Sequence, residues 1–546
     1  MKRITILTAC LLASALALAG NVRGRVICDG LPVQGVPVSD GASIVLTDAS
    51  GRYDLDSDKS DGSVFIITPS GFIARTLDGL RPGFWQPLYL PATQEEIHDF
   101  VLEKQDQSRY TVVMLADMHL SNDPDRDDLR RFREEVMPTV REQVAKAAPA
   151  GPVYTINLGD TTHDVYWTEM NFNESDGLRY LQDLPYPTPM YSIMGNHDHD
   201  PSIVGKDVDK RAGWRERDCW GPGAYSVNIG GDHWVFLDNI YYVNVEGKGK
   251  PAPGVKGDRS YKSKLTARQI DWLAADLALV DKDTRIYICT HAPVLYTGGK
   301  NGLLMPQSQV ERIAALCAPF RHDVTVFSGH IHRNDICDHP DFPRIHQRSL
   351  PATSGIMWTT PVGWPLYGNE GSDAGFWVGE FEAAAAPRYR LETYLYGEKY
   401  CRIYDLNEVG KAYRSSEGIK KMKDLYSGGS RLDYGDKKWR NYVFLNYWGW
   451  EPGDSVQILE KNRSLKVEAT RYEDPAKTFA YELPRIMNPY KHSTPKPRDN
   501  TFHMFVARAS SAKSPVTVRI YASDGRLKFE KTVQRPIAFD PSEKEE

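Results

Sequence analysis

Five short polar motifs between Asp117 and His332 have the residue types and the spacing of a metal site. Each follows directly on an apolar run of strand type, namely TVVMLA, VYTINL, MYSIM, RIYICT and VTVFS. In chain order the motifs are Asp117-Met118-His119, Gly159-Asp160, Gly195-Asn196-His197-Asp198, His291 and Gly329-His330-Ile331-His332. A single Asp-x-His or Gly-Asp pair is more often a turn or a capping pair. Five such motifs, each at the end of a strand-like run, predict one shared site on the loops at the strand ends.

These residue types indicate two-metal chemistry at phosphorus. Two divalent ions roughly 3.5–4 Å apart share a hydroxide that is nucleophilic at neutral pH, and they clamp the attacking and leaving oxygens. Imidazole, carboxylate and amide ligands without a thiolate suit manganese, iron or zinc. The sequence does not choose among these three metals.

In this order, the motifs resemble the calcineurin-like metallophosphoesterase superfamily over about 215 residues. The resemblance implies that Asp117, His119, Asp160 and His332 hold one transition-metal ion, and that Asp160, Asn196, His291 and His330 hold the other. Asp160 is then the bridge, which a carboxylate can form and an imidazole cannot. His197 matches the family histidine that is not a ligand and that stabilises the phosphoryl group or protonates the leaving group.

One departure from the family's motifs narrows the choice of subfamily. Purple acid phosphatases have a tyrosine ligand three residues after the bridging aspartate, where this chain has His163, and their first motif is Asp-x-Gly. The chain therefore resembles a colourless member. His163 and Asp164 lie either beside the site or in a surface turn, and the same alternatives stand for His199 and Asp200.

Composition and the first residues suggest an exported protein. The chain has 546 residues, enough for roughly three domains, and its net charge of −5 offers no basic surface for extended nucleic acid. Residues 1–19 read as a signal peptide, with Lys2 and Arg3 before an apolar core. Leu7 to Cys10 resembles a lipobox, but the apolar run continues past Cys10, so cleavage after Ala19 is preferred. We expect a periplasmic or secreted protein without a membrane span, in preference to an outer-surface lipoprotein.

Three domains are expected after the signal peptide. Residues 22–104 read as an immunoglobulin-like or prealbumin-like β-sandwich, 108–394 as an α/β catalytic domain, and 395–540 as a second, smaller all-β domain. In the central part, apolar spacing predicts a helix over 126–148 with a kink at Pro138 and another over 265–280 with Thr266 as N-cap. Gly230-Gly231 predicts a hairpin turn. These elements fit the four-layer αββα sandwich that the resemblance implies.

The stretch 349–381 is rich in Gly, Pro and aromatic residues and predicts a long ordered loop. Trp358, Trp364 and Tyr367 either line the substrate pocket or plug a domain interface. Arg333 directly follows His332 and is a further candidate for phosphate binding. No Arg or Lys stands immediately beside the motifs on the Asn196 side, which favours a diester over a dianionic monoester.

The predicted function is an exported metal-dependent phosphoesterase acting on a small molecule, a glycan or a lipid headgroup. One alternative is a nucleotide-directed phosphohydrolase or nuclease of the same superfamily. Another is a glycan-binding protein that has lost activity, although all seven ligand positions and His197 are present. The sequence assigns neither disulfide pairing nor oligomeric state.

Overall fold

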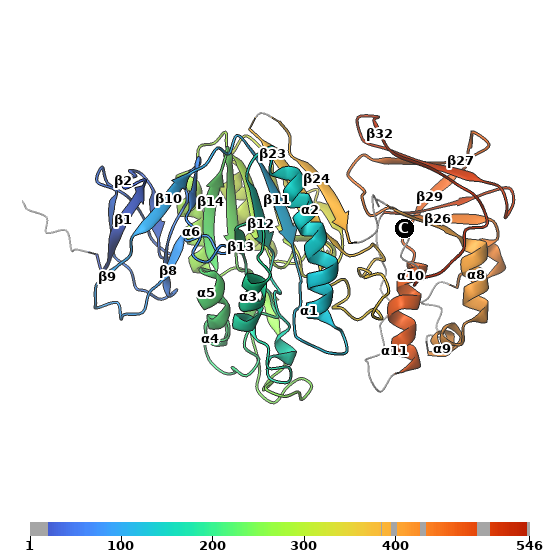
Figure 1. The fold of residues 1–546 in the computed structure, drawn as a ribbon, viewed down its shortest axis with the longest axis horizontal. Coiled ribbons are helices and arrows are strands. Elements are labelled where there is room, and N and C mark those ends of the chain that lie inside the picture. The colour runs from blue at the N-terminus through green and yellow to red at the C-terminus, as the bar shows by residue number, and fades with distance from the viewer. Residues whose placement is uncertain (1–19, 384, 395–400, 426–432, 489–502, 543–546) are drawn as a thin grey trace, which may run out of the picture.

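The computed structural model describes residues 20–383, 385–394, 401–425, 433–488 and 503–542. These form three regions in a row, with the N-terminal region at the left of Figure 1, the α/β region in the centre and the C-terminal region at the right. The predicted signal peptide and the predicted domain start at 395 lie outside the described residues. No helix among the described residues is long and apolar enough to cross a membrane.

The N-terminal region is a sandwich of two sheets, as its alternating apolar pattern predicts. In β5 the exposed and buried positions alternate strictly, the pattern of a strand with one face against a core. One sheet has the order β2-β1-β10-β7, with β5 and β9 also paired to β1, and the other has the order β4-β3-β6-β8. The strands are β1 (Val22–Cys28), β2 (Leu31–Pro32), β3 (Pro37–Ser39), β4 (Ile44–Leu46), β5 (Arg52–Leu55), β6 (Ser63–Ile66), β7 (Phe72–Ala74), β8 (Trp85–Pro87), β9 (Glu96–Ile97) and β10 (Phe100–Lys104).

Two sheets form the middle of the central region. The five-stranded sheet, ordered β13-β12-β11-β23-β24, consists of β11 (Arg109–Leu115), β12 (Val153–Asn157), β13 (Met190–Ser192), β23 (Gly375–Glu382) and β24 (Arg388–Thr393). The six-stranded sheet, ordered β14-β15-β18-β20-β22-β21, consists of β14 (Ala224–Ile229), β15 (Asp232–Leu237), β18 (Arg285–Thr290), β20 (Val324–Ser328), β21 (Asp335–Asp338) and β22 (Ile345–Ser349). Trp234 of one sheet meets Phe381 of the other edge to face, with ring centroids 5.2 Å apart. Aromatic packing of this kind holds the two sheets face to face.

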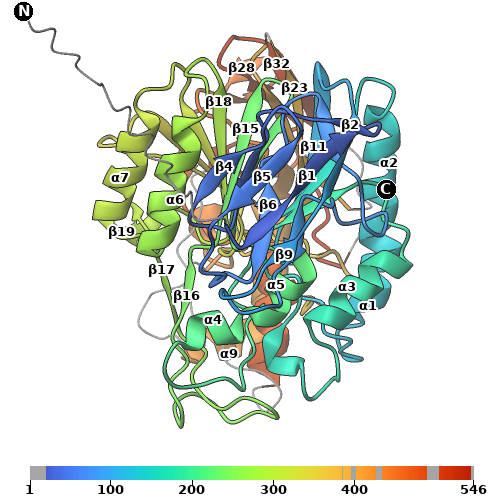
Figure 2. The same ribbon diagram turned by 90° about the vertical axis from the view of Figure 1, so that its left-hand side faces the viewer.

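Helices cover both outer faces, so the predicted αββα sandwich is confirmed. Figure 2 shows α6 (Ala267–Ala278) and α7 (Gln307–Cys317) on one side of the strands, with α2 (Met137–Ala147) and α3 (Glu174–Asp183) on the other. The remaining elements of the central region lie at the strand ends and are α1 (Asp128–Arg131), α4 (Val208–Ala212), α5 (Trp214–Trp220), β16 (Ile240–Tyr242), β17 (Tyr261–Ser263) and β19 (Leu295–Lys300).

The local predictions in this region also hold. The predicted helix over 126–148 forms as α1, a π-helical turn over Phe132–Val136, and α2 with Pro138 in its first turn. Proline has no backbone N–H for the regular helical hydrogen bond to the carbonyl four residues earlier, and the helix accommodates this through the π turn before Pro138. Thr266 caps α6 through a capping box with Gln269. β14 and β15 pair as the predicted hairpin about Gly230-Gly231.

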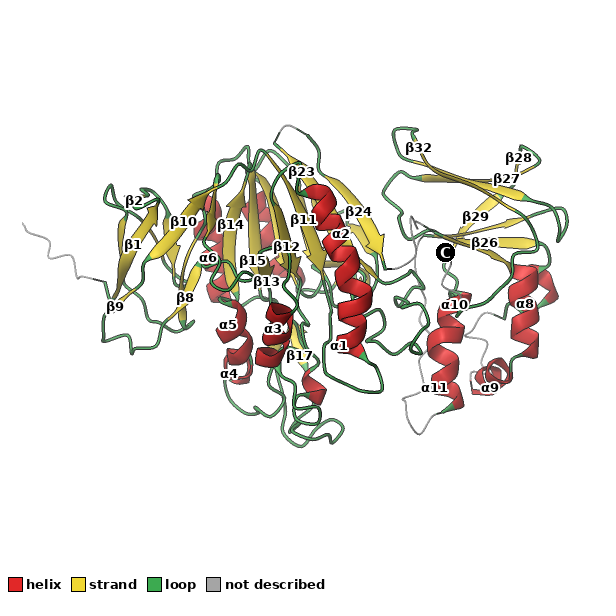
Figure 3. Ribbon diagram, in the orientation of Figure 1, coloured by secondary structure: helices red, strands yellow, loops and turns green. Residues whose placement is uncertain are grey.

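The C-terminal region contains two four-stranded sheets and helices that the sequence analysis did not predict (Figure 3). The helix α8 begins after Asp405, whose side chain accepts from the N–H of Asn407, and it buries Leu406, Val409 and Tyr413 on one face. Helical spacing therefore does exist there, within a mostly polar segment. The elements are β25 (Arg402–Asp405), α8 (Leu406–Ser415), α9 (Glu417–Leu425), β26 (Tyr442–Asn446), β27 (Ser455–Glu460), β28 (Arg463–Ser464), β29 (Val467–Thr470), α10 (Pro475–Lys477), α11 (Leu483–Met487), β30 (Met504–Arg508), β31 (Val516–Tyr521) and β32 (Leu527–Val533).

Candidate metal centre

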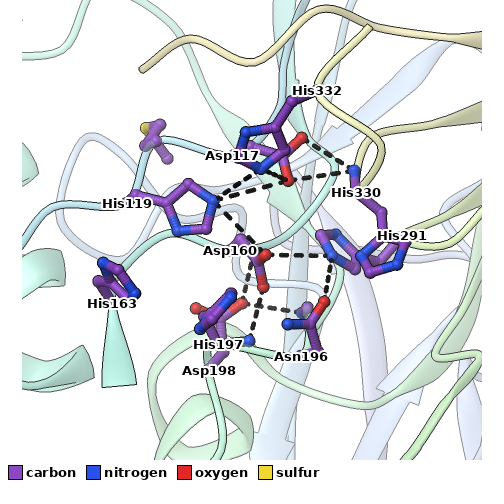
Figure 4. Close-up of polar contacts among 12 residues, drawn as sticks. Asp117, His119, Asp160, His163, Asn196, His197, Asp198, His291, His330 and His332 are labelled. Carbon is purple, nitrogen blue, oxygen red and sulfur yellow. Dashed lines mark hydrogen bonds and ion pairs between the residues drawn. The ribbon is translucent and has the colours of Figure 1, made fainter. Parts of the chain in front are cut away.

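The five motifs meet because their strands end at the same edge of the two sheets. β11, β12 and β13 run parallel as neighbours in the five-stranded sheet, and β18 and β20 run parallel in the six-stranded sheet. Each motif follows the carboxyl end of one of these strands. Figure 4 shows Asp160 in the middle of the group, with His119, His291 and Asn196 around it. The structure therefore brings together all seven residues that the sequence predicts as ligands.

The first donor group consists of Asp117, His119, Asp160 and His332 and is buried. The Nε2 atoms of His119 and His332 lie 3.0 Å apart, and Nε2 of His332 lies 3.3 Å from Oδ1 of Asp117. Nε2 of His119 is 3.7 Å from Oδ2 of Asp160. Four nitrogen and oxygen donors this close together have the chemistry of a transition-metal site.

The second donor group shares Asp160 with the first and adds His291 and His330. Nε2 of His291 lies 3.3 Å from Oδ2 of Asp160 and 3.1 Å from Oδ1 of Asn196. At the edge of this group, the hydroxyl of Tyr261 contacts Nε2 of His330 at 2.8 Å. Asp160 is thus the carboxylate between the two groups.

The backbone around the site is shaped to bring these donors together. Five of the seven have left-handed φ angles, a conformation that costs non-glycine residues roughly 1–3 kcal/mol each and gathers at functional sites. These are Asp117 (54°), His119 (48°), Asp160 (55°), His330 (70°) and His332 (52°). Three glycines of the motifs, Gly159, Gly195 and Gly329, leave no room for a side chain. A Cβ would lie 2.1 Å from Oδ1 of Asp160 at Gly195, 2.5 Å from Oδ2 of Asp117 at Gly329, and 2.7 Å from Nδ1 of His291 at Gly159.

Neighbouring groups fix how the donors point. Nδ1 of His291 contacts the carbonyl oxygen of Leu158 at 2.7 Å, which leaves Nε2 facing the donor group. The buried carboxylate of Asp198 accepts from the N–H of Asp160 at 2.7 Å and from that of Gly195 at 2.8 Å. Sequence reasoning missed Asp198, which extends the GNHD motif but braces the loops and is not a donor. Donor types, burial and orientation together fit two metal ions.

The pKa shifts of the histidines agree with a role as metal ligands. Burial lowers the pKa of His119 well below its usual value and that of His330 to about 3, so both rings are neutral and keep a lone pair for a metal. At His291 burial also lowers the pKa, but the charge of Asp160 outweighs it and raises the pKa to about 9. A cation bound at Asp160 would favour the neutral His291 ring, whose Nε2 could then serve as a ligand.

His197 lies beside the donor groups and belongs to neither of them. Its Nδ1 contacts Oδ1 of Asp164 at 2.6 Å, and its backbone N–H donates to Oδ1 of Asp160 at 2.7 Å. With Nδ1 held by a carboxylate, Nε2 is the ring atom available to a substrate. Of the two alternatives for His163 and Asp164, the structure favours the one beside the site, because both are buried there.

His163, Asp164 and His197 form a third group of possible metal donors. Two guanidinium groups contact it, however. Nη1 of Arg126 lies 3.2 Å from Nδ1 of His163, and Nη1 of Arg259 donates to Oδ1 of Asp164 at 2.7 Å. Two cations in direct contact oppose a third metal ion and favour an anion.

His199 and Asp200 take no part in the donor groups. The ring of His199 is buried and stacks on Tyr242 with centroids 4.5 Å apart, and its Nδ1 contacts the carbonyl of Gly195 at 3.0 Å. Asp200 accepts from the N–H of Ser202 at 2.9 Å and so forms a local turn. His199 supports the loop that carries Asn196.

The stretch between β22 and β23 is a loop, as predicted, but its aromatic residues do not line a pocket. Trp358 is buried, and its Nε1 donates to the carbonyl of Met118 at 2.7 Å. Tyr367 is also buried and donates to the carbonyl of Pro541 at 3.0 Å, while Trp364 packs against the same C-terminal core. The polar atoms of Trp358 and Tyr367 are satisfied inside the protein, so the pocket-wall interpretation is corrected to core packing for Trp358 and interface packing for Tyr367. Trp364 is half-buried against the same interface core.

Three arginines lie near the site, and two of them, Arg126 and Arg259, come from parts of the chain that carry no motif. Arg333 lies near the buried carboxyls of Asp335 and Glu370. Burial raises the pKa of both carboxyls, and the positive charge of Arg333 only partly offsets this rise. Arg126 and Arg259 instead contact the His163, Asp164 and His197 group. The predicted diester preference rests on the lack of an Arg or Lys immediately beside the motifs on the Asn196 side, and Arg259, which is distant in sequence, supplies a cation beside His197 that this reasoning did not consider. Proximity in sequence could not find Arg259, which is 95 residues from Asp164.

Comparison with known proteins agrees with this description. Residues 110–334 match the family described as calcineurin-like phosphoesterase, and residues 20–105 match its N-terminal domain. No curated protein matches the chain.

Solved structures that match part of the chain include the following three. A dimetal phosphatase from Danio rerio is 15% identical, with 52% of this chain and 95% of that chain covered and a TM-score of 0.31. A 5'-nucleotidase from Candida albicans is 12% identical, with coverage of 51% and 50% and a TM-score of 0.30. A calcineurin-like phosphoesterase from Bacillus subtilis is 10% identical, with coverage of 53% and 91% and a TM-score of 0.27. On the two family matches, with the donor groups at the strand ends, the chain belongs to the calcineurin-like phosphoesterase superfamily.

Proposed function

We propose that this protein is an exported phosphoesterase with two metal ions, acting on a phosphoester of an extracytoplasmic small molecule, glycan or lipid headgroup. One observation carries the proposal: two buried donor groups share the carboxylate of Asp160 and lie beside His197. Membership of a phosphoesterase family supports the reaction class.

When bound, two metal ions at these groups supply a water nucleophile at neutral pH and polarise the phosphoryl oxygens. The chain's own residues do the rest. Oδ2 of Asp160 faces both donor groups, through His119 on one side and His291 on the other. Its Oδ1 accepts from the backbone N–H of His197 and so fixes that residue. Asp164 orients the His197 ring, so that a proton on Nε2 can pass to the leaving oxygen of the substrate.

The test is a screen of the purified, metal-replete protein against phosphate monoesters and diesters, including nucleotides, sugar phosphates and phospholipid headgroups. Metal content is measured in parallel by elemental analysis. We expect two metal ions per chain and hydrolysis of at least one substrate class. Activity confined to nucleotides would favour the nucleotide-directed alternative, and two bound metals without any hydrolysis would favour the glycan-binding alternative.

The export part of the proposal rests on residues 1–19, which have a basic start and an apolar core. Cell fractionation and N-terminal sequencing of the mature protein test it directly. We expect a mature chain that begins at Gly20 and is found outside the cytoplasm. A cytoplasmic chain that retains Met1 would contradict export without bearing on the reaction.

A further inference from the structure

Arg259 has a backbone conformation and a contact that the mechanism above does not use. It lies in the loop between β16 and β17 with φ 52°, and it is the only left-handed arginine among those that the structure describes. A left-handed non-glycine residue persists only where its surroundings hold it, and such outliers gather at functional sites. The N–H of Arg259 is held by Oδ1 of Asn244 at 2.8 Å.

The side chain of Arg259 extends to the same oxygen atom that positions His197. Oδ1 of Asp164 accepts from Nη1 of Arg259 at 2.7 Å and contacts Nδ1 of His197 at 2.6 Å. Asp164 is buried, with 1% of its side chain exposed, whereas Arg259 is 28% exposed. A guanidinium has five N–H donors, and in the described part of the chain this one has no acceptor except Asp164. Arg259 therefore has donors to spare beside the ring that reaches the substrate.

The simpler role for Arg259 is to anchor its loop, but that loop is already held by other bonds. Val245 N–H donates to Oδ1 of Asp258 at 2.9 Å, and Val243 N–H donates to the carbonyl of Ser260 at 2.7 Å. Arg126, the other cation at this group, differs because each of its three guanidinium nitrogens already has a partner, whereas Arg259 contacts Asp164 through Nη1 alone. Arg126 contacts Asp123 at 3.1 Å and Tyr166 at 2.7 Å, in addition to His163.

We propose that Arg259 binds the phosphoryl group of the substrate and makes this site select phosphomonoesters over phosphodiesters. The proposal rests on the proposed function, since it concerns the substrate of the same site. Because one oxygen atom holds both His197 and Arg259, a phosphoryl group within reach of the imidazole lies beside the guanidinium. A monoester is close to a dianion above pH 7 and offers one more charged oxygen than a diester, which suits the fork of N–H donors on an arginine.

The experiment compares p-nitrophenyl phosphate with bis-p-nitrophenyl phosphate at pH 8 under identical manganese loading, for wild type, Arg259→Gln and Arg259→Lys. Arg268→Gln is the matched control. Arg268 is 30% exposed and pairs with Asp58 at 2.9 Å and Asp61 at 2.7 Å, at the contact with the N-terminal region. We expect Arg259→Gln to lower kcat/KM for the monoester about 10- to 100-fold more than for the diester, the range for a lost charge-assisted hydrogen bond. Arg259→Lys should fall between, and Arg268→Gln should leave the ratio unchanged.

A second readout does not depend on turnover. Inorganic phosphate is titrated into each metal-loaded protein by calorimetry, with metal content measured on the same samples. Arg259→Gln should weaken phosphate binding at least tenfold with its metal content unchanged. If Arg259→Gln does not fold, Arg259→Lys is compared with wild type in the same two measurements.

The outcomes separate the two proposals. A wild-type protein that cleaves neither ester, and no other phosphoester of the screen above, removes the proposed function and this inference with it. A wild-type protein that is active, with a monoester-to-diester ratio and a phosphate affinity that neither Arg259 variant changes, overturns only the role of Arg259. Equal losses on both esters with normal phosphate affinity would make Arg259 a positioning residue for His197, and would also overturn it.

Discussion

Substituting alanine for Gly195 tests whether the close packing of the strand-end loops creates the metal site. The added Cβ would lie 2.1 Å from Oδ1 and 2.3 Å from the backbone N of Asp160, whereas real Cβ contacts essentially never fall below 3.0 Å. Asp160 and its loop must therefore move by at least 0.9 Å, the difference between 2.1 and 3.0 Å. A displacement of about 1 Å in a catalytic site costs on the order of 10²-fold in rate. Because Asp160 is common to both donor groups, both should lose affinity for metal.

The assay measures metal content by elemental analysis, kcat/KM on the best substrate of the screen, and unfolding by urea. Gly195→Ala should retain the fold with a loss of roughly 1–3 kcal/mol, bind fewer than two metals, and lose activity about 10²-fold. The control is Gly231→Ala in the turn between β14 and β15, where an added Cβ meets nothing within 4 Å. Two tightly bound metals and activity within threefold of wild type in Gly195→Ala would refute the reasoning.

Four further predictions address separate parts of the structure. Asp160→Asn should lower the content of both metals, because it removes charge at the shared position; elemental analysis with both metals at wild-type affinity would contradict the bridge. His197→Ala should keep its metals while kcat falls roughly 10²–10⁴-fold, with exposed His322→Ala as control, and metal loss in His197→Ala would make it a ligand. Trp358→Ala should cost roughly 3–5 kcal/mol in urea unfolding with KM unchanged, since the indole is in the core; a KM change without a stability loss would restore the pocket-wall interpretation. Burial raises the pKa of Glu174 from 4.5 to about 7, although the hydrogen bonds from Trp220 and Thr162 lower it. The stability that protonated Glu174 contributes is therefore fully present below pH 4.5 and is lost as the pH rises through 7. The melting temperature of the metal-free wild type should fall relative to that of Glu174→Gln between these two pH values. A difference in melting temperature that stays constant over this range would contradict the raised pKa.

What could be predicted from the sequence depends on whether the information is local. The apolar run before Asp160 and the polar residues after it are adjacent in the chain, so the strand and the donor at its end could be predicted together. The same holds for Thr266 and Gln269, three residues apart in the cap of α6. Arg259 could not be placed, because its partner Asp164 is 95 residues away and the contact exists only after the two sheets pack. Trp358 could be assigned to a loop, but the direction of its side chain depends on a carbonyl 240 residues away.

The distribution of the donors over two sheets determines when the protein can take up its metals. Asp117 and Asp160 follow strands of one sheet, and His291 and His332 follow strands of the other. A partly synthesised chain has no complete donor group before β20 has joined the second sheet. The metal that these donors would take up is consequently set by the ions available when folding of both sheets is complete. Once bound, the ions tie the two sheets together, so that chelation should loosen the whole central region and not only the loops around Asp160.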